Sequence, residues 1–436
     1  MRKNILAMLM IASLNAYASK VVVVDNFEQI EIELKTLSDG DFIKTNSYSS
    51  GTYPYGSAIY KVISSSNCQS GIDIRAMQVK SEKVCAELVI KTEMELEAFG
   101  VEKVSVPDEC NDETKDSTKQ VNAALDKVST LKVNGLYCAS KLELKSKPNS
   151  RQSIIGSNPL IAGFYSTNIQ ASTNTGITSF VTTNEQRSFP ITLMNLTLDA
   201  RQNHDVVLGV NWFFGYHSDL ILSGAKTTTL NIKSDQGTIV NNVFKNITFK
   251  GNVSKAHMFV KNATDWHLEG GTFESTSSVN LQVDSDSLAG VLINGVKFNG
   301  KVIIPNNSYG SRIISNQIED LNISASSGFG SGQIGPNNKI KKLNVTPGDN
   351  RINLVRSISN TISSLEFNSE TGGSKGVRFV SHLDDIGQFP DSQRSTDQYI
   401  FKKSKVNYRD VTYNLCGEFN SGDFSNGLNS KIYGCQ

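Results

Sequence analysis

The sequence predicts an all-β protein whose main part is a right-handed, single-stranded parallel β-helix, with an N-terminal capping helix and a small N-terminal β-rich module. A strand pattern recurs through the middle of the chain at intervals of 22 to 27 residues, which suits one coil of such a helix. Asn, Ser and Thr are abundant, and these residues favour turns and strand ends over helix interiors. No cysteine lies between Cys138 and Cys416, so packing and hydrogen bonds must hold the repeated region together.

Length and charge restrict the class of protein. The chain has 436 residues, of which 38% are hydrophobic, and its formal net charge is +1. A disordered chain would have fewer apolar residues and a larger net charge. A general nucleic-acid-binding protein would need a strong positive field, which this net charge does not supply. The length suits two or three compact domains or one elongated solenoid.

The first 18 residues have the pattern of a secretory signal peptide. Arg2 and Lys3 form a basic start, residues 5–14 form an apolar run, and an Ala-x-Ala motif ends at Ala18. The apolar run is too short for a membrane span, and no later stretch is long enough. We expect cleavage before Ser19 and a secreted or periplasmic protein.

Six cysteines follow the expected cleavage site, and export makes disulfides the default. Their clustering favours three local bridges: Cys68–Cys85, Cys110–Cys138 and Cys416–Cys435. The first bridge would lie in a small β-rich module predicted for residues 19–96. The last would lie in a C-terminal cap predicted for residues 391–436.

A short helix is predicted for residues 116–128. Asp116 or Ser117 can cap its N-terminus, and an apolar stripe at helical spacing follows in Val121, Ala124, Leu125 and Val128. This helix would cover the open end of the β-helix, which is an edge that a solenoid has to hide.

The repeat can be read by columns. Each copy ends in a short strand whose alternate apolar residues face one side. We expect the last apolar residues of eight copies to stack in one inward column of a parallel sheet: Leu198, Leu222, Phe249, Phe273, Phe298, Ile323, Val345 and Phe367. A second apolar column lies five residues earlier in each copy. His217 is the exception there and is predicted to be a buried, hydrogen-bonded histidine.

Turn residues recur three positions before the last apolar residue of most copies, as Asn195, Asp219, Asn246, Gly270, Gly295 and Asp320. Asp219 and Asp320 are therefore predicted to cap backbone groups. A further column contains Asn242, Asn316, Asn338 and Asn360, whose amides can hydrogen-bond along the stack. Helical repeats do not fit, because Asn, Gly and Asp interrupt the pattern every few residues. A propeller blade would need about 40–45 residues.

The segment before the repeats carries a family resemblance. Its features are, in order, Glu97-Ala-Phe-Gly100, Asp116-Ser-Thr118, Val133-Asn-Gly-Leu-Tyr137, Lys141-Leu-Glu-Leu144 and Ile154-Ile-Gly156. This order resembles the opening of the pectate-lyase-like β-helix superfamily, although Asp116-Ser-Thr118 replaces an Asp-Asp-Thr motif. The resemblance covers residues 97–156, and the repeats extend it to about residue 370. The β-helix is therefore expected over residues 97–390.

A second resemblance concerns residues 34–62, which contain Leu37-Ser-Asp-Gly-Asp41. They are similar to the small N-terminal module of phage tailspike and capsule-depolymerase proteins, which implies a homotrimer. The superfamily resemblance implies action on acidic or neutral polysaccharides by lyase or hydrolase chemistry. No signature motif of either chemistry is present, so the candidate residues follow from their positions in the repeat.

The densest ionisable cluster in the repeats is Asp265-Trp-His-Leu-Glu269. Leu268 belongs to an inward column, so alternation places Asp265, His267 and Glu269 on the outer face. Lys245 and Asn294 occupy the Glu269 column on the flanking coils. Two carboxylates suit glycoside hydrolysis, whereas a base beside a cation suits elimination from a uronate. His267 is the natural base, since the ordinary pKa of histidine is about 6.5. Asp265 or Glu269 would orient it or hold a cation.

Asp284 and Asp286 form a second cluster. If Val283 points inward, both carboxylates point outward about 7 Å apart, which suits an inverting pair or a calcium site. These two aspartates complete the set of expected catalytic residues, and Ca²⁺ is the only cofactor that the sequence suggests. Residues 201–205, which include an arginine, a histidine and an aspartate, are a weaker third candidate.

The leading hypothesis is a secreted β-helix protein that acts on a polysaccharide as a lyase or a glycoside hydrolase. The competing hypothesis is a non-catalytic, carbohydrate-binding adhesin or a structural spike. A search for cleavage across a panel of polysaccharides distinguishes them.

Overall fold

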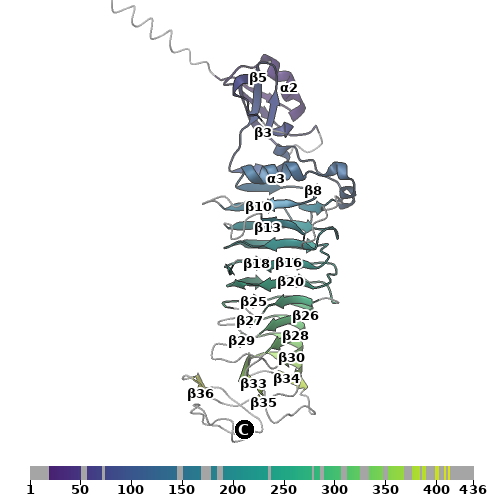
Figure 1. Cartoon of the computed structure of the whole chain (residues 1–436), viewed down its shortest axis with the longest axis vertical. Coiled ribbons are helices and arrows are strands. Elements are labelled where there is room, and N and C mark those ends of the chain that lie inside the picture. Colours follow the sequence, from purple (N-terminus) through teal and green to yellow (C-terminus); the bar gives the residue numbers. More distant parts are fainter. Residues whose placement is uncertain are drawn as a thin grey trace, which may run out of the picture. The chain divides into compact units, whose positions relative to one another are not determined.

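Figure 1 shows the computed structural model of the chain. The chain forms two compact units, one containing residues up to 102 together with 119–131, and the other containing 103–118 and the residues from 132 onward. Each unit is described by itself. The structure describes residues 19–50, 56–70, 74–144, 151–167, 178–183, 190–233, 237–276, 279–284, 289–305, 312–324, 333–346, 352–367, 376–382, 385–388, 398–401, 407–408 and 411–412. The expected signal peptide and the Cys416–Cys435 pair lie outside these residues.

The N-terminal unit is built on a five-stranded sheet with the strand order β1-β2-β3-β5-β4. Only β1 and β2 run parallel. Tyr60 is buried in its core and donates a hydrogen bond to the carbonyl oxygen of Ala76 at 2.9 Å. A disulfide joins Cys68 to Cys85, which confirms the first expected pair. The five strands are β1 (Val21–Val24), β2 (Phe42–Thr45), β3 (Ala58–Ser64), β4 (Gln78–Lys80) and β5 (Val84–Leu88). The next strand, β6 (Glu93–Glu95), does not belong to this sheet.

Short helices surround this sheet. They are η1 (Phe27–Gln29), α2 (Ile30–Glu33), η2 (Leu34–Thr36), η3 (Ser65–Asn67), η4 (Arg75–Met77) and η5 (Leu96–Phe99). The longer helix expected near residue 116 is α3 (Thr118–Lys127). Its predicted apolar stripe is buried, and the Asp116 carboxylate accepts a hydrogen bond from the backbone N–H of Thr118 at 3.3 Å. The helix is therefore confirmed.

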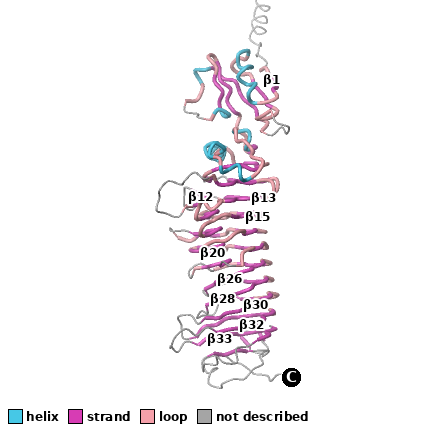
Figure 2. Tube along the Cα trace, turned by 90° about the vertical axis from the view of Figure 1, so that its right-hand side faces the viewer, coloured by secondary structure: helices cyan, strands magenta, loops and turns pink. Residues whose placement is uncertain are grey.

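The second unit is a parallel β-helix, in which three stacks of short strands follow one another around each coil (Figures 1 and 2). Most strands pair in parallel with strands of the coils before and after them. The first stack contains β10 (Gln152–Gly156), β13 (Ile191–Asp199), β15 (Tyr216–Ser223), β18 (Val243–Lys245), β22 (His267–Glu269), β25 (Leu292–Asn294), β27 (Arg312–Ile314), β29 (Gln333–Ile334) and β31 (Ile352–Ile358).

In several coils one long strand bends from one stack into the next. The second halves of β13 and β15 belong to the second stack, with β8 (Leu136–Ala139), β11 (Gly163–Ser166), β19 (Thr248–Phe249), β23 (Thr272–Phe273), β26 (Lys297–Pro305), β28 (Gln317–Ser324), β30 (Lys339–Thr346), β32 (Thr361–Phe367) and β34 (Asp385–Gln388).

The third stack begins with β9 (Leu142–Leu144), β12 (Ser179–Thr183), β14 (Val206–Val210), β16 (Thr228–Lys233), β20 (Ala256–Lys261) and β24 (Val279–Val283). The ends of β26, β28, β30 and β32 continue it. The remaining strands are β7 (Thr130–Val133), β17 (Ile239–Val240), β21 (Ala263–Thr264), β33 (Gly376–His382), β35 (Gln398–Phe401), β36 (Asn407–Tyr408) and β37 (Val411–Thr412).

The inward column predicted from the repeat forms over its first five members. Leu198 is in register with Leu222, and the column continues through Phe249 and Phe273 to Phe298. The Phe249 and Phe273 rings stack with centroids 4.1 Å apart at 4°. Identical side chains at one strand position thus fill the interior of consecutive coils.

The column changes after Phe298, and the eight-member column is wrong at this point. Phe298 is in register with Ile318, whereas Ile323 is in register with Ile304 in the third stack. The reason is that β26 and the strands after it run from the second stack into the third, so the last apolar residue of each later copy faces the third side of the coil. The local sequence pattern is the same in second-stack and third-stack strands, because both kinds of strand follow a corner of the coil.

The predicted turn column is confirmed over its first five positions. Asn195, Asp219 and Asn246 have positive φ angles of 53° to 56°, and Gly270 and Gly295 follow with 68°. Asn, Asp and Gly are the residues that tolerate this left-handed backbone best. Asp320 is a correction, because it lies inside β28 and is in register with Lys301 and Lys342. The positive-φ position of that coil is Ser315.

Buried asparagines form a ladder along the later coils. Asn316 donates through its side-chain amide to the Oδ1 of Asn338 at 3.0 Å, and Asn338 donates to the Oδ1 of Asn360 at 2.8 Å. Each of these residues precedes a strand of the second stack. Asn242 was predicted in the same column but precedes a strand of the first stack, where it binds the loop at Trp212 and Gly215. The shared motif therefore marks two different corners.

Asn338→Ala is expected to lower the free energy of unfolding by about 2–3 kcal/mol, because it removes a set of buried hydrogen bonds. Asn338 also donates to the Ile313 carbonyl oxygen at 2.8 Å, which the substitution would leave without that donor. Denaturant unfolding measures the effect. The matched control is Asn337→Gly, at an exposed neighbour whose φ of 66° glycine adopts without strain. Equal stability of the two variants would contradict the structural role of the ladder.

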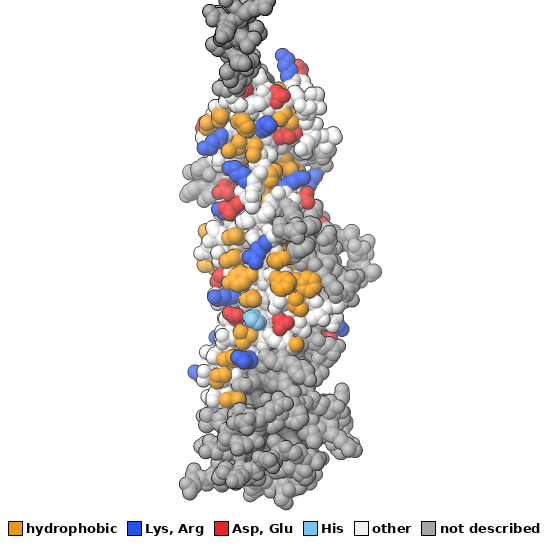
Figure 3. Space-filling model, turned by 90° about the vertical axis from the view of Figure 1, so that its left-hand side faces the viewer, with side chains coloured by type: hydrophobic (Ala, Val, Ile, Leu, Met, Phe, Trp, Pro, Cys, Tyr) orange, Lys and Arg blue, Asp and Glu red, His pale blue; other side chains and the backbone are white. Residues whose placement is uncertain are grey.

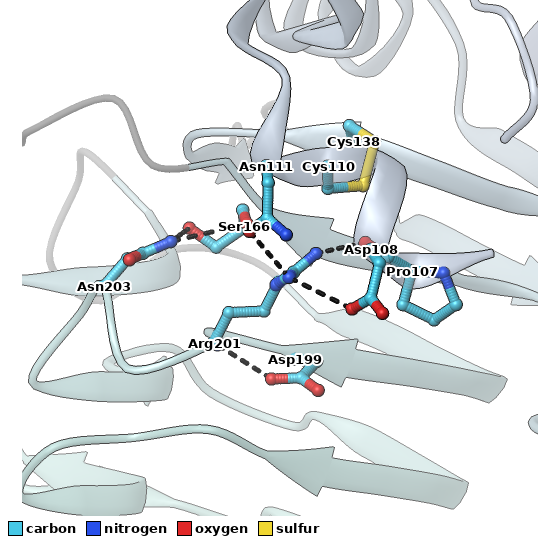
Figure 4. A network of polar contacts seen from close by, with 9 residues as sticks. All are labelled: Pro107, Asp108, Cys110, Asn111, Cys138, Ser166, Asp199, Arg201 and Asn203. Atoms are coloured by element: carbon cyan, nitrogen blue, oxygen red, sulfur yellow. Dashed lines mark hydrogen bonds and ion pairs between the residues drawn. A yellow bond between two sulfur atoms is a disulfide. The ribbon is translucent and has the colours of Figure 1, made fainter.

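A polar network fixes the segment before the first coils. Arg201 donates to the Pro107 carbonyl oxygen and to the Oδ1 of Asn111 at 2.9 Å, and it forms an ion pair with Asp108 at 3.5 Å. The three partners lie in or beside the short helix η6 (Pro107–Asn111), which η7 (Glu113–Lys115) follows. Figure 4 shows this arrangement beside the Cys110–Cys138 disulfide, which confirms the second expected pair.

Candidate functional site

The candidate site lies on the outer side of the first strand stack. Strands β15, β18, β22 and β25 are in parallel register there, so outward side chains form two columns along the axis. The inward side chains between these columns are buried and fix the strands. The first outward column contains Tyr216, Val243, His267 and Leu292. The second contains Lys245, Glu269 and Asn294, in register with Ser218, which is buried.

His267 and Glu269 are brought together by one short strand. Leu268 between them is buried, and the backbone N–H of His267 donates to the Asn242 carbonyl oxygen at 2.8 Å. The His267 Nδ1 lies 3.5 Å from the Glu269 Oε1, and the two side chains are 37% and 34% exposed. An imidazole beside a carboxylate at a solvent-accessible surface is an arrangement that can accept a proton from a bound molecule.

Lys245 adds a positive charge to this pair. It is in register with Glu269 on the preceding coil, as the repeat predicted, and Asn294 is in register on the following coil. Neighbouring strands lie about 4.8 Å apart, so the ammonium and carboxylate groups are close enough to act on one ligand. Figure 3 shows a face of the molecule on which acidic, basic and histidine side chains lie among hydrophobic ones.

Asp265 is exposed, but it is placed by a turn and not by strand alternation. Its φ angle is 52°, and its backbone N–H donates to the Ala289 carbonyl oxygen at 2.7 Å. Trp266, the next residue, is buried. The outward position was expected from alternation along one strand, whereas the strand begins only at His267.

Asp284 lies in a different part of the coil. It follows β24 in the third stack and forms an ion pair with Lys261 at 3.2 Å. Nearby, the Lys255 ammonium lies 3.5 Å from the centroid of the Phe259 ring, and burial lowers the pKa of Lys255. Asp286 lies outside the described residues. Asp284 therefore belongs to a different strand stack from His267 and Glu269.

The weaker third candidate has structural contacts in the described residues. Arg201 holds η6, as described above. His204 is almost fully buried, with its Nε2 2.8 Å from the Ser140 carbonyl oxygen, and burial is the main cause that lowers its pKa. Asp205 accepts hydrogen bonds from the backbone and hydroxyl groups of Thr178. These contacts join neighbouring coils.

Within the described ranges, no group of three or more His, Cys, Asp or Glu side chains is arranged to hold a metal ion. Asp286, which belongs to the suggested calcium site, lies outside those ranges. No helix in the described part of the chain has the length and apolar character needed to cross a membrane.

Sequence reasoning missed one feature of this surface. The repeat pattern does not mark Phe213, Phe214 or Tyr216 as site residues, but Phe214 is 53% exposed and the other two are half-buried. The available signal was their position at a corner, directly before a strand whose inward residue is His217.

The protein is a parallel β-helix protein, and its fold is that of phage tailspikes. No family model matches the chain, and no curated protein matches it. It is similar to the tailspike protein gp49 from the Acinetobacter baumannii bacteriophage Fri1, a capsular polysaccharide depolymerase, with 13% identity and a TM-score of 0.53 over 84% of this chain and 69% of that chain.

Two other tailspikes give similar values. The gp42 tailspike of Acinetobacter phage vb_AbaP_AS12 has 12% identity and a TM-score of 0.50 over 95% of this chain and 78% of that one. The enzymatically active domain of bacteriophage CBA120 tailspike protein 2 has 12% identity and a TM-score of 0.48 over 92% of this chain. The chain spans 66% of that domain.

Proposed function

We propose that the protein acts on a polysaccharide at the outer face around His267, with His267 as the general base. The His267–Glu269 pair carries this proposal, because it joins a proton acceptor to an orienting carboxylate at an accessible sheet surface. The gp49 tailspike is a capsular polysaccharide depolymerase, and the shared fold supports a polysaccharide as the substrate class.

Elimination from a uronate is the reaction that suits these groups best. His267 would take the proton from the carbon next to the uronate carboxyl group, and Lys245 would stabilise the negative charge that develops there. The bond to the leaving sugar oxygen then breaks, a carbon–carbon double bond forms, and the leaving oxygen takes up a proton. Glu269 would hold the imidazole in position. Hydrolysis by a carboxylate pair that includes Asp265 is the alternative that the same assay detects.

Export to an oxidising compartment is part of the proposal. The two disulfides in the described residues support it, because such bonds form and persist outside the reducing cytosol. A protein secreted from the cell would also meet extracellular polysaccharides directly.

His267→Ala is expected to lower the cleavage rate at least about 100-fold, which is the usual contribution of a general base. The assay follows two signals on a panel of uronate-containing and neutral polysaccharides: ultraviolet absorbance of unsaturated uronates, and new reducing ends. Absorbance with reducing ends indicates elimination, and reducing ends alone indicate hydrolysis. Glu269→Gln should give a smaller loss, and thermal unfolding should stay unchanged in both variants, because both side chains face outward.

The matched control is Glu274→Gln. Glu274 is an outward carboxylate of the second stack and pairs with Lys250 at 3.6 Å. Wild-type turnover in His267→Ala and Glu269→Gln would exclude this site. Binding of a polysaccharide without cleavage by the wild-type protein would instead support the adhesin hypothesis.

A further inference from the structure

The turn before β15 exposes three aromatic side chains. We call Phe213, Phe214 and Tyr216 the aromatic turn. Phe214 is 53% exposed, which is unusual for a large apolar side chain, and Phe213 lies beside it with ring centroids 6.3 Å apart. Tyr216 is the first residue of β15 and belongs to the outward column of His267.

Buried residues fix the backbone of the aromatic turn. The Asn242 side chain accepts a hydrogen bond from the Gly215 backbone N–H at 3.1 Å and donates one to the Trp212 carbonyl oxygen at 2.9 Å. The Trp212 indole N–H donates to the His217 Nε2 at 3.4 Å. A side chain at position 215 would clash with Asn242 and Trp212. These contacts fix the backbone that carries the exposed rings, as a preorganised binding surface requires.

Phe214 has a left-handed backbone conformation, which the equivalent positions of the following coils reach with other residue types. Its φ angle is 55°, an outlier for a bulky residue. The equivalent positions of the next three coils are Asn241, Asp265 and Gly290, all with positive φ and all of types that tolerate it. Strain of this kind gathers at functional sites, and the ring that causes it here points to solvent.

The aromatic turn lies on the same surface as the candidate catalytic pair. Tyr216 is in register with Val243, and Val243 is in register with His267. Two strand spacings separate Tyr216 from His267, or about 10 Å along the axis. Lys245 occupies the adjoining outward column, on the coil between them. A chain molecule that follows the coil axis can therefore touch the aromatic turn and His267 at once.

We propose that the aromatic turn is a carbohydrate-binding subsite that stacks pyranose rings of the polysaccharide. The apolar C–H face of a pyranose packs against an aromatic ring, while its hydroxyl groups remain free for water and for polar neighbours. The proposal deepens the proposed function and rests on it for the ligand class. It assigns binding to the aromatic turn and leaves chemistry to His267.

The test uses Phe214→Asn in the full chain. Asparagine occupies the equivalent position of the next coil, so this variant should keep or raise the melting temperature. Its affinity for the polysaccharide that binds the wild-type protein most tightly should fall about tenfold or more. Affinity electrophoresis in gels containing polygalacturonate, alginate, hyaluronan, xanthan or dextran measures the dissociation constant. Leu160→Asn is the matched control, since Leu160 is an exposed apolar residue of another turn.

The outcomes separate this inference from the proposed function. Loss of binding in Phe214→Asn, with wild-type binding in Leu160→Asn, supports the subsite even if no cleavage is found. Unchanged affinity in Phe214→Asn overturns it, as does a wild-type protein that binds none of the five polysaccharides. Sedimentation velocity tests the other occupant. A wild-type oligomer that dissociates in Phe214→Asn would show that a second copy covers these rings, which also overturns the proposal.

Discussion

Phe273→Ala is expected to lower the free energy of unfolding by about 3–5 kcal/mol, the usual cost of removing a buried phenylalanine ring. Phe273 is fully buried between two other rings, 4.1 Å from the centroid of Phe249 and 4.9 Å from that of Phe298. The cavity would lie in the middle of a stack whose coils contact only their neighbours, so both adjacent coils lose packing.

Denaturant unfolding followed by circular dichroism measures this loss. Thr272→Ala is the matched control, because Thr272 is the preceding residue of the same strand and is only half-buried. Phe273→Leu should fall between the two, since it keeps most of the apolar volume. A loss in Phe273→Ala no larger than that in Thr272→Ala would contradict the phenylalanine stack.

Acidification is expected to destabilise the β-helix through His217. This side chain is fully buried between Trp212 and Phe244, and burial lowers its pKa to about 3. In the unfolded chain this histidine has the ordinary pKa of about 6.5. Between this pH and about 3, the unfolded chain therefore binds a proton at His217 that the folded protein does not bind. The stabilisation is complete above about pH 6.5 and is lost as the pH falls from there towards 3, by up to ~5 kcal/mol in total.

His217→Leu should make the free energy of unfolding less dependent on pH across this window. Leucine occurs at the same column position in the coil before, as Leu193. The comparison uses the slope between pH 7.5 and pH 4 and not the absolute stability, because the substitution also removes a hydrogen bond to Trp212. A further decrease in slope is expected on adding His257→Leu, since burial lowers the pKa of His257 to about 4. Identical slopes in wild type and His217→Leu would exclude this mechanism.

The candidate site could be predicted only in part. The spacing of apolar residues around Leu268 placed His267 and Glu269 outward, and the register with Lys245 and Asn294 followed from the repeat. Asp284 was also expected on the outer face, but it follows β24 in the third stack. Alternation distinguishes inward from outward along one strand, and it carries no information about the direction in which a different strand of the coil faces.

The aromatic turn shows the same limit. Phe213 and Phe214 are of a residue type that is usually found in protein cores, so the sequence favours burial of both side chains. Their exposure depends on Asn242 in the next coil and on the tight contact at Gly215, neither of which can be read from the turn itself.

The sequence by itself determined the local features of this protein: a β-helix built from short strands, the inward residues of each strand, the left-handed corner positions and the local disulfide pairs. These follow from side-chain alternation, from the tolerance of Asn, Asp and Gly for positive φ, and from short separations along the chain. Only the tertiary structure decided which strand lies above which. Two corners with the same Asn-led motif can belong to different sides of a coil. The number of residues in each turn sets the register that brings Phe214, Tyr216 and His267 onto one face. That number depends on packing against the neighbouring coils.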